Sequence, residues 1–262
     1  MKNKRVEYNT VSKSLTSLDI RGSLSTWGTW ERLVPKQIAN DPGSQKLLKS
    51  HLRRYEAAMS YSSGKQVLDI ACGTGYGSQM LRTSGAASVV GVDKFPIVIQ
   101  YARQNYQIQG IEFVCVDAEE FEWPEQFDTV ISFETLEHLP NPDKFLGRVR
   151  SLLRPEGKLL LSVPLGETRH IDPYHLHSFS QEDVFVMLEK SGFLVEQYHC
   201  DHLFLTSFEL IQWRKLYPES PATIYDLLFT HRGQQLMHNI IFRGGLLVPE
   251  LLVIAHPTQT SL

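Results

Sequence analysis

Short apolar runs alternate with helical patterns in the middle of the chain, from residue 66 to residue 164. The runs are nearly continuous in Val, Ile and Leu, which is typical of parallel strands covered by helices on both faces. Strands separated by helices indicate βαβ units, and therefore an α/β fold with a doubly wound, Rossmann-like sheet. Five strands are predicted here, over Gln66–Ala71, Ser88–Asp93, Glu112–Asp117, Thr129–Phe133 and Lys158–Pro164.

Helices are predicted where apolar residues recur at helical spacing. Two of them, Pro96–Tyr106 and Pro142–Leu153, lie between the predicted strands. A third follows the fifth strand over Gln181–Ser191, with Ser180 as its N-cap and Gly192 ending it. Each helix therefore has a face that can cover the sheet.

The segments on either side of this region extend the predicted fold. Two further strands, Phe193–Cys200 and Glu250–His256, give a seven-stranded sheet. Residues 203–245 between them are too many for a hairpin loop, and insertions of this length are usually functional. Upstream, Ser44–Ser60 has a helical pattern. We therefore expect a leader over residues 1–60 that forms a helical lid, and a main domain over residues 61–262 that carries the insertion.

Composition excludes several classes of protein. The 262 residues are 42% hydrophobic and 21% charged, with a formal net charge of -3 that provides no basic field for nucleic acid. No run approaches the roughly 20 apolar residues of a membrane span, and no apolar secretory segment follows the polar N-terminus. Cys72, Cys115 and Cys200 are far apart, which predicts neither disulfides nor a zinc site. We expect a soluble, cytoplasmic protein with no membrane or nucleic-acid partner.

Candidate chemistry begins where the first predicted strand runs into a turn with glycine at every second position, Gly73, Gly75 and Gly77. Glycine has no Cβ, so a ligand can approach the backbone closely at such positions. Asp93 ends the next strand about 20 residues later, where doubly wound folds offer a carboxylate to ribose hydroxyls. Asp117 ends the third strand in the same way. Together they predict a nucleoside-cofactor site at the switch point of the sheet.

A nicotinamide dinucleotide is an alternative occupant of such a site. Its fingerprint would require glycine at the position of Ser78. Asp69 lies just before the glycine turn, where a carboxylate would face a pyrophosphate unfavourably but can pair with an amino-bearing ligand. Both observations favour a different adenosine cofactor.

Residues 66–164 resemble the class I S-adenosylmethionine-dependent methyltransferases. Asp69, Gly73 and Gly75 match the first motif of that family, whose loop wraps the methionine part of the cofactor. Asp93 matches the acid that binds the ribose hydroxyls, and Asp117 with its neighbour resembles the adenine-binding pair. The resemblance implies S-adenosylmethionine as cofactor, S-adenosylhomocysteine as product, and an antiparallel last strand.

The resemblance also implies which residues bind the cofactor. Phe133–Leu139 resembles the segment after the fourth strand, whose first residues line the methionine site. The expected cofactor-binding residues are Asp69, Ala71, Gly73, Gly75, Tyr76, Asp93, Lys94, Asp117, Ala118, Phe133 and Glu134.

A second similarity indicates the class of the methyl acceptor. It lies at Trp30–Pro35 and His51–Tyr55. These stretches are similar to the leader of bacterial methyltransferases that act on sugars or secondary metabolites. We therefore expect O-methylation of a small, sugar-bearing or secondary-metabolite acceptor. Alternatives are N-methylation of a small amine, methylation of a protein or tRNA, and a scaffold that binds the cofactor without turnover.

Methyl transfer from a sulfonium is an in-line displacement, so the protein mainly positions the acceptor and removes its proton. His138 follows the fourth strand and can accept a proton near pH 7, although it can also simply hold the loop. His175 is a second candidate base, within the histidine-rich segment Arg169–Phe179. Metal ligation by that segment is a further alternative, but we predict no metal site.

Aromatic residues lie in both the leader and the insertion. Trp27, Trp30 and Tyr55 suit a lid that excludes water, or packing of the leader on the domain. The insertion residues suit either an apolar acceptor pocket or the interface of a homodimer, namely Phe204, Phe208, Trp213, Tyr217, Tyr225 and Phe229.

Overall fold

The computed structural model describes residues 33–38, 40–166, 174–216, 234, 238 and 241–258. One mixed sheet runs through the described residues, with seven strands in the order β3-β2-β1-β4-β5-β7-β6. The first five strands are parallel, and β7 is antiparallel to both β5 and β6. This confirms the predicted doubly wound sheet with an antiparallel last strand. The strands are β1 (Gln66–Ile70), β2 (Ser88–Asp93), β3 (Ile111–Cys115), β4 (Phe127–Phe133), β5 (Leu153–Pro164), β6 (Phe193–Thr206) and β7 (Gly245–Pro257).

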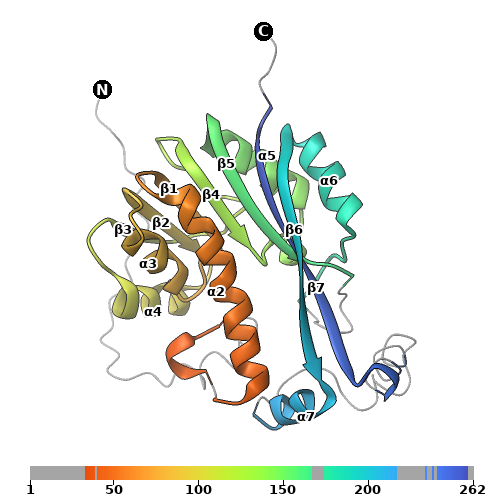
Figure 1. Cartoon of the computed structure of the whole chain (residues 1–262). Helices are drawn as coiled ribbons and strands as arrows, with labels where there is room; N and C mark the ends of the chain where they lie inside the picture. Colours follow the sequence, from red (N-terminus) through yellow and green to blue (C-terminus); the bar gives the residue numbers. More distant parts are fainter. Residues whose placement is uncertain are drawn as a thin grey trace.

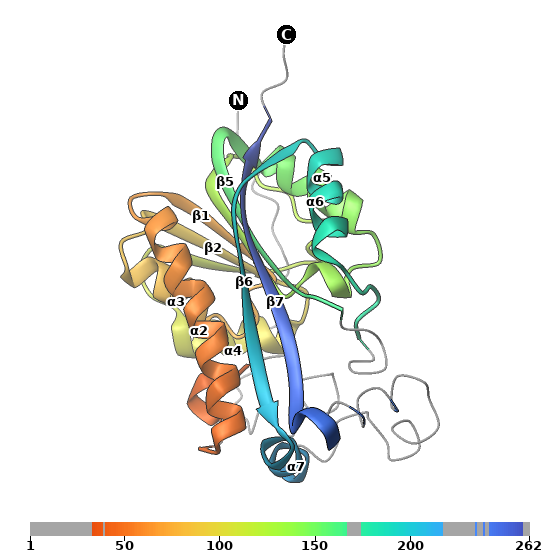
Figure 2. The same ribbon diagram turned by 45° about the vertical axis from the view of Figure 1, so that its right-hand side comes forward.

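Helices cover both faces of the sheet (Figures 1 and 2). One face carries α2 (Pro42–Ser62), α3 (Tyr76–Thr83) and α4 (Pro96–Tyr106), and the other carries α5 (Pro142–Leu152) and α6 (Gln181–Lys190). Each face has its own cluster of buried apolar side chains. The structure adds α7 (Ser207–Leu216) and two short 3₁₀ turns, η2 (Pro35–Gln37) and η3 (Leu136–His138).

Most element boundaries agree with the sequence pattern, and the exceptions have physical causes. The predicted bounds of β2 and α4 are confirmed. The predicted N-cap of α6 is also confirmed, because Ser180 and Asp183 form a reciprocal capping box. β5 begins earlier than predicted, since Leu153 already pairs with Phe127 across a register shift. Helix α3, which the sequence pattern did not predict, begins directly after Gly75.

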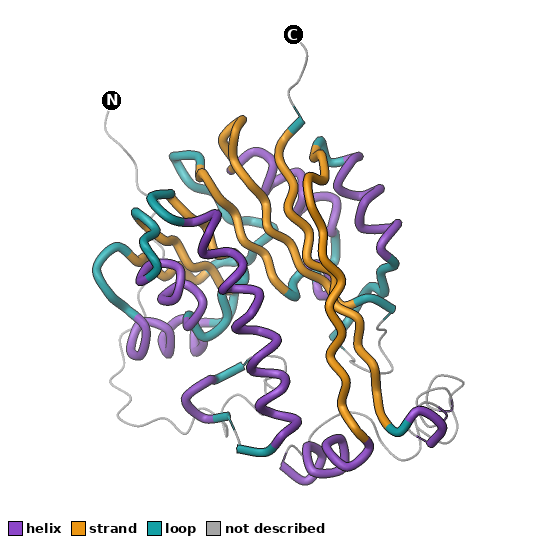
Figure 3. Tube along the Cα trace, viewed as in Figure 1, coloured by secondary structure: helices purple, strands orange, loops and turns teal. Residues whose placement is uncertain are grey.

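The strands β6 and β7 are longer than the sequence indicated. They pair from Phe193↔Pro257 to Thr206↔Gly245, whereas β5 pairs with β7 only as far as Glu250. Beyond that point the two strands continue as a two-stranded arm, which Figure 3 shows below the rest of the sheet. Part of the predicted insertion is therefore strand, and α7 follows at the end of the arm. No helix among the described residues is long and apolar enough to cross a membrane.

Gly77 is required by the packing of α2 on α3. A Cβ at this position would lie 2.0 Å from Cζ of Tyr55, whose ring packs edge-on against Tyr76 and Phe133. We expect Gly77→Ala to lower the free energy of unfolding by about 1–3 kcal/mol or more, because the overpacked ring must shift. Urea denaturation measures this.

Gly147 provides the matched control for this prediction. It is exposed within α5, and a Cβ there would meet nothing within 4 Å. Gly147→Ala should raise the free energy of unfolding by about 0.5–1 kcal/mol, because alanine is the better helix former. Equal effects of the two substitutions would contradict the proposed packing role of Gly77.

Candidate active site

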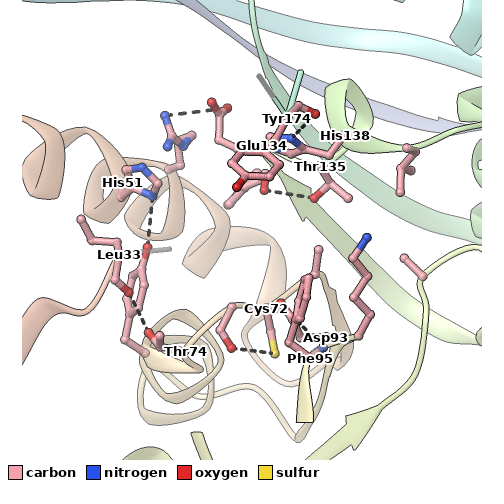
Figure 4. Close-up of a pocket in the computed structure, with 18 of the residues that line it drawn as sticks. Leu33, His51, Cys72, Thr74, Asp93, Phe95, Glu134, Thr135, His138 and Tyr174 are labelled. Atoms are coloured by element: carbon pink, nitrogen blue, oxygen red, sulfur yellow. Dashed lines mark hydrogen bonds and ion pairs between the residues drawn. The ribbon is translucent and has the colours of Figure 1, made fainter. Parts of the chain in front are cut away.

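A cavity of about 330 Å³ lies at the carboxyl ends of β1, β2 and β4. These strands are neighbours in the sheet, and the chain order reverses between β1 and β4. Ligands of open α/β sheets bind at such a switch point. The residues that line the cavity come from the turns after these strands, from α2 and from the segment that follows residue 173 (Figure 4).

Most of the residues expected to bind the cofactor line this cavity. They are Ala71, Gly73, Tyr76, Asp93, Lys94, Asp117, Ala118, Phe133 and Glu134. Asp69 and Gly75 are not among the lining residues. The parallel strands explain the agreement, because their carboxyl ends meet at one edge of the sheet.

The backbone around the cavity adopts conformations that only glycine usually accepts. Ala71 and Glu134 have φ values of 64° and 51°, and both follow strands at the cavity edge. A left-handed conformation costs a non-glycine residue about 1–2 kcal/mol, and such residues cluster at functional sites. Gly73 has φ 54°, and a Cβ there would meet nothing within 4 Å. The turn after β1 thus leaves open space where a ligand can approach.

The remaining glycines of this turn serve packing, which corrects the expectation that each makes room for a ligand. Gly75 has φ 86°, and a Cβ there would lie 2.7 Å from both Cβ of Ala102 and Cζ of Phe113. Gly77 faces Tyr55 in the same way. Of the three, only Gly73 lines the cavity.

Asp69 lies inside the protein rather than on the cavity surface. Its carboxylate accepts hydrogen bonds from Oγ of Ser78 at 2.6 Å and from Oη of Tyr55 at 3.2 Å. Burial raises the pKa of Asp69 to about 6, although these hydrogen bonds favour the charged form. These contacts fix α2 and α3 around the glycine turn, and the expected pairing of Asp69 with an amino-bearing ligand stays a prediction.

This raised pKa predicts a pH-dependent contribution to stability. The folded state holds the Asp69 proton up to about pH 6, whereas the unfolded chain releases it near pH 4. The contribution of the protonated Asp69 to the free energy of unfolding is fully present below pH 4. It falls by about 3 kcal/mol as the pH rises to 6. Relative to Asp69→Asn, the wild type should therefore lose stability over this range in urea denaturation. A difference between the two proteins that does not change with pH would contradict this.

Two carboxylates lie at the ends of neighbouring strands on one side of the cavity. Asp93 is buried at the end of β2 and accepts a hydrogen bond from the backbone N–H of Phe95 at 3.0 Å. Asp117 follows β3 and accepts one from the backbone N–H of Glu119 at 3.0 Å. Figure 4 shows Asp93 and Phe95 together at this side. These backbone contacts hold both carboxylates at the cavity edge.

The opposite side is formed by α2, which contributes none of the expected cofactor-binding residues. His51, Arg54 and Tyr55 line the cavity there. Nδ1 of His51 lies 3.3 Å from Oη of Tyr76. Burial and the charge of Arg54 hold the pKa of His51 well below its usual range, so its ring is neutral. The sequence signal for His51 and Arg54 was the leader similarity at His51–Tyr55, which was applied to the acceptor alone, and Tyr55 was also expected in the lid.

A described part of the leader also reaches the cavity. Oγ of Thr74 donates a hydrogen bond to the carbonyl oxygen of Leu33 at 2.8 Å, and both residues line the cavity. The predicted lid residues Trp27 and Trp30 lie outside the described residues. Tyr55, the third of them, is buried against Tyr76 and Phe133.

The insertion aromatics do not line this cavity as far as the structure describes them. Phe204 and Phe208 are exposed, and neither is a lining residue. The other four, Trp213, Tyr217, Tyr225 and Phe229, are not among the described side chains. Their expected role in an acceptor pocket or a dimer interface stays a prediction.

The two candidate bases are neighbours, but only His138 lines the cavity. Its ring lies 4.8 Å from that of His175, and its Nδ1 lies 3.2 Å from the carbonyl oxygen of Tyr174. Burial lowers the pKa of His175 to about 4, so that ring is neutral and a weak base. Leu176 and His177 donate backbone hydrogen bonds to the carbonyl oxygen of Glu137, which holds this segment beside η3.

Side chains of Glu137, His138 and His175 approach one another, with one ligand atom of each within 4.8 Å of the others. His138 Nε2 lies 3.6 Å from Oε1 of Glu137. Two imidazoles and a carboxylate are ligands that a transition metal accepts. The same contacts suit a histidine whose orientation is fixed by its neighbours.

Comparisons with known proteins identify the family. A model described as a methyltransferase domain matches residues 61–222, more than half of the chain. A ubiquinone biosynthesis O-methyltransferase of Coxiella burnetii is 33% identical over 159 residues, which cover 57% of this chain and 61% of that protein. A fatty-acid O-methyltransferase of Mycolicibacterium smegmatis is 38% identical over 106 residues, covering 40% of this chain and 39% of the relative. The match thus spans less than two thirds of these relatives.

Solved structures show the same fold at low sequence identity. The YcgJ protein of Bacillus subtilis superposes with a TM-score of 0.63 at 17% identity, covering 80% of this chain and all of that one. The N-methyltransferase NodS of Bradyrhizobium japonicum, in complex with S-adenosylhomocysteine, gives a TM-score of 0.56 at 15% identity, covering 84% and 90%. With the family model, the sheet order and the position of the cavity in agreement, the chain belongs to the methyltransferase-domain family, within the class I S-adenosylmethionine-dependent methyltransferases.

Proposed function

We propose that the protein transfers the methyl group of S-adenosylmethionine to a hydroxyl group of an apolar small molecule. The observation that carries this proposal is the cavity at the switch point, with carboxylates on one side and basic and aromatic side chains on the other. Relatives of the chain are named for ubiquinone biosynthesis and for O-methylation of fatty acids, so an apolar acceptor fits them better than a sugar.

The side chains of the cavity fit this cofactor. Asp93 and Asp117 offer acceptors for the ribose hydroxyls and for the adenine side of the cofactor. Gly73 leaves open space for the part of the cofactor that lies between these carboxylates and α2. Arg54 lines the cavity on the side of α2 and adds a positive charge there. When bound, S-adenosylmethionine supplies a methyl group on a sulfonium.

We assign binding roles accordingly. Asp93 holds the ribose hydroxyls, Asp117 and Ala118 flank the adenine, and Lys94 closes that end. The methionine part lies along the turn after β1 and the end of β4, beside Ala71, Gly73, Tyr76, Phe133 and Glu134. Asp69 and Gly75 act indirectly in this proposal, by fixing the shape of the turn.

His138 is the proposed general base. With a proton on Nδ1 it donates to the carbonyl oxygen of Tyr174, which leaves Nε2 able to accept the proton of the acceptor hydroxyl. The imidazolium that forms lies 3.6 Å from Glu137, whose carboxylate stabilises the charge. The ring therefore has a fixed orientation and a partner for each charge state.

Apolar side chains surround this base. Leu139, Tyr174 and Leu176 line the cavity beside His138. An apolar acceptor buries surface against them, and such burial stabilises binding by about 25 cal/mol per Å². This side of the cavity is the proposed acceptor site.

The proposal is tested by incubating the full chain with S-adenosylmethionine carrying a labelled methyl group. The acceptors are a prenylated catechol, a hydroxy fatty acid, a glycosylated phenol and a primary amine. We expect label on a hydroxyl of one of the first two compounds. Label on the amine alone would replace the proposal by N-methylation. No transfer to any of them by a protein that binds the cofactor would favour a scaffold.

A further inference from the structure

Two histidines and a carboxylate meet at one wall of the cavity. Glu137 and His138 belong to η3, and His175 belongs to the segment that follows residue 173. One ligand atom from each of the three side chains lies within 4.8 Å of the others. Glu137 and His175 are buried, with 1% and 6% exposed, whereas His138 is partly exposed and lines the cavity. An ion that enters the cavity can therefore reach this cluster past His138.

The cluster combines ligands that are far apart in the sequence. The histidines of Arg169–Phe179 alone predict no metal site, because such sites usually combine histidine with carboxylates from other elements. The fold provides this combination, since η3 brings one carboxylate and one imidazole to His175. Two imidazoles and one carboxylate, with a fourth position left to water, are a common ligand set of zinc.

The distances in the cluster are close to those of a zinc site. Zn–N and Zn–O bonds are about 2.0–2.1 Å long and tetrahedral, which places two ligand atoms about 3.4 Å apart. Nε2 of His138 lies 3.6 Å from Oε1 of Glu137. The ring centroids of His138 and His175 are 4.8 Å apart. To share one ion, the ligand atoms of the cluster need to approach one another by no more than about 1.4 Å.

The orientation of His138 is the one that a ligand histidine needs. Its Nδ1 lies 3.2 Å from the carbonyl oxygen of Tyr174 (Figure 4). Metal-binding histidines usually donate from their second ring nitrogen to a carbonyl or a carboxylate, which leaves the other nitrogen to the metal. With the proton on Nδ1, Nε2 of His138 is the nitrogen that can bind an ion beside Glu137.

The segment that carries His175 is held by the backbone of η3. The carbonyl oxygen of Glu137 accepts hydrogen bonds from the N–H groups of Leu176 and His177, at 2.7 and 3.2 Å. Nε2 of His177 also lies 2.9 Å from the carbonyl oxygen of Leu139. The three ligands therefore belong to two segments that are bonded to each other. Ligands that are held in place before binding lose little conformational freedom when they bind an ion.

We propose that Glu137, His138 and His175 form a binding site for a divalent transition metal, zinc above all, and that an ion bound there switches methyl transfer off. The ion binds the electron pair of Nε2 in His138, which is the pair that accepts the proton of the acceptor hydroxyl. Since metal and proton compete for the same nitrogen, a metal-bound His138 cannot act as the base. The inhibition rests on the proposed function, whereas the binding of the metal does not.

The site is tested by titrating the untagged full chain with zinc against a chromophoric chelator, which gives the dissociation constant and the stoichiometry. We expect the wild type to bind one zinc ion per chain in this cluster. Glu137→Gln and His175→Asn, each shown to be folded by circular dichroism, should bind zinc at least about 10-fold more weakly, because even the loss of a group that only supports a ligand costs about 10–100-fold.

His177→Gln is the matched control for the zinc titration. His177 lies in the same segment and contacts Leu139 of the same loop, but it is not one of the three ligands. Glutamine keeps a side-chain donor at this position. His177→Gln should therefore bind zinc as tightly as the wild type.

Cobalt(II) provides a second measurement on the wild type, which does not depend on the folding of any variant. Its d–d absorption should indicate a site of low coordination number, without the charge-transfer band that a thiolate ligand adds. Cys72 also lines the cavity and is a free cysteine. A thiolate band would assign the metal to such a cysteine and would overturn the inference.

The inhibition is tested by methyl transfer to a hydroxyl acceptor. The rate of the wild type should fall as zinc is added, with half-inhibition at the zinc dissociation constant, and should return when EDTA removes the metal. Magnesium at the same concentration should leave the rate unchanged, because it prefers oxygen ligands.

The outcomes separate this inference from the proposed function. A wild type that binds no zinc, or variants Glu137→Gln and His175→Asn that both bind it as tightly as the wild type, would overturn the site. Zinc bound in the cluster without a change in rate would overturn the inhibition. If no acceptor is methylated even without zinc, the proposed function fails, and the zinc and cobalt titrations still decide the site.

Discussion

Replacing His138 with alanine is expected to lower kcat by about 10²–10⁴-fold, the usual contribution of a positioned general base. The reason is the position of this ring, which lines the cavity and is held by Tyr174 and Glu137. Affinity for S-adenosylmethionine should change little, because the cofactor is assigned to other residues. The measurement is steady-state kinetics with a hydroxyl acceptor, together with calorimetry of cofactor binding.

His175 provides the comparison for this prediction. It touches His138 but does not line the cavity, and burial lowers its pKa to about 4. His175→Ala should therefore reduce kcat less than His138→Ala, through loss of support for the neighbouring ring. If His175→Ala has the larger effect, the assignment of the base is wrong. If both substitutions are mild, an amine becomes the better acceptor, since it needs little help from a base.

Replacing Asp93 with alanine should weaken the binding of S-adenosylhomocysteine by about 100-fold or more. A buried carboxylate that accepts hydrogen bonds from ribose hydroxyls contributes about 1.5–3 kcal/mol per bond, and two such bonds are assigned here. The same carboxylate also accepts from the backbone N–H of Phe95, which the substitution leaves without that partner. Calorimetry with the wild type and the variant measures the loss.

Asp93→Asn separates the two contributions of this residue. Its side-chain oxygen can still accept from Phe95, so the local backbone should be kept while the charge is lost. We expect an intermediate affinity for S-adenosylhomocysteine. A variant Asp93→Ala that is folded and binds as tightly as the wild type would contradict the assignment of Asp93 to the ribose.

The hydrophobic pattern predicted much of the sheet because central parallel strands are apolar throughout. This is why the bounds of β2 and α4 agree with the sequence. The outer part of β6 is half exposed and mixed in composition, and among the described strands it pairs with β7 alone, which is far away in the sequence. No local pattern marks such a strand, so the arm was read as part of an insertion. The short helix α3 has only one large aliphatic residue at full burial, Leu81, and was missed for a similar reason.

The sequence likewise predicted some residues of the candidate site and missed others. Residues at strand ends, such as Gly73, Asp93 and Glu134, could be placed at one edge because parallel strands bring their carboxyl ends together. His51 and Arg54 reach the cavity only because α2 packs across this face, and that packing depends on contacts distant in the sequence. Whether a glycine of the turn after β1 faces the cavity or a packed side chain also depends on residues that are distant in the sequence.

The central claim is that this cavity binds S-adenosylmethionine and its product. The most direct measurement is calorimetry of the full chain with S-adenosylhomocysteine and, in parallel, with NADH. We predict binding of one S-adenosylhomocysteine per chain and no binding of the dinucleotide. A folded protein that binds NADH, or that binds neither ligand, would contradict the account.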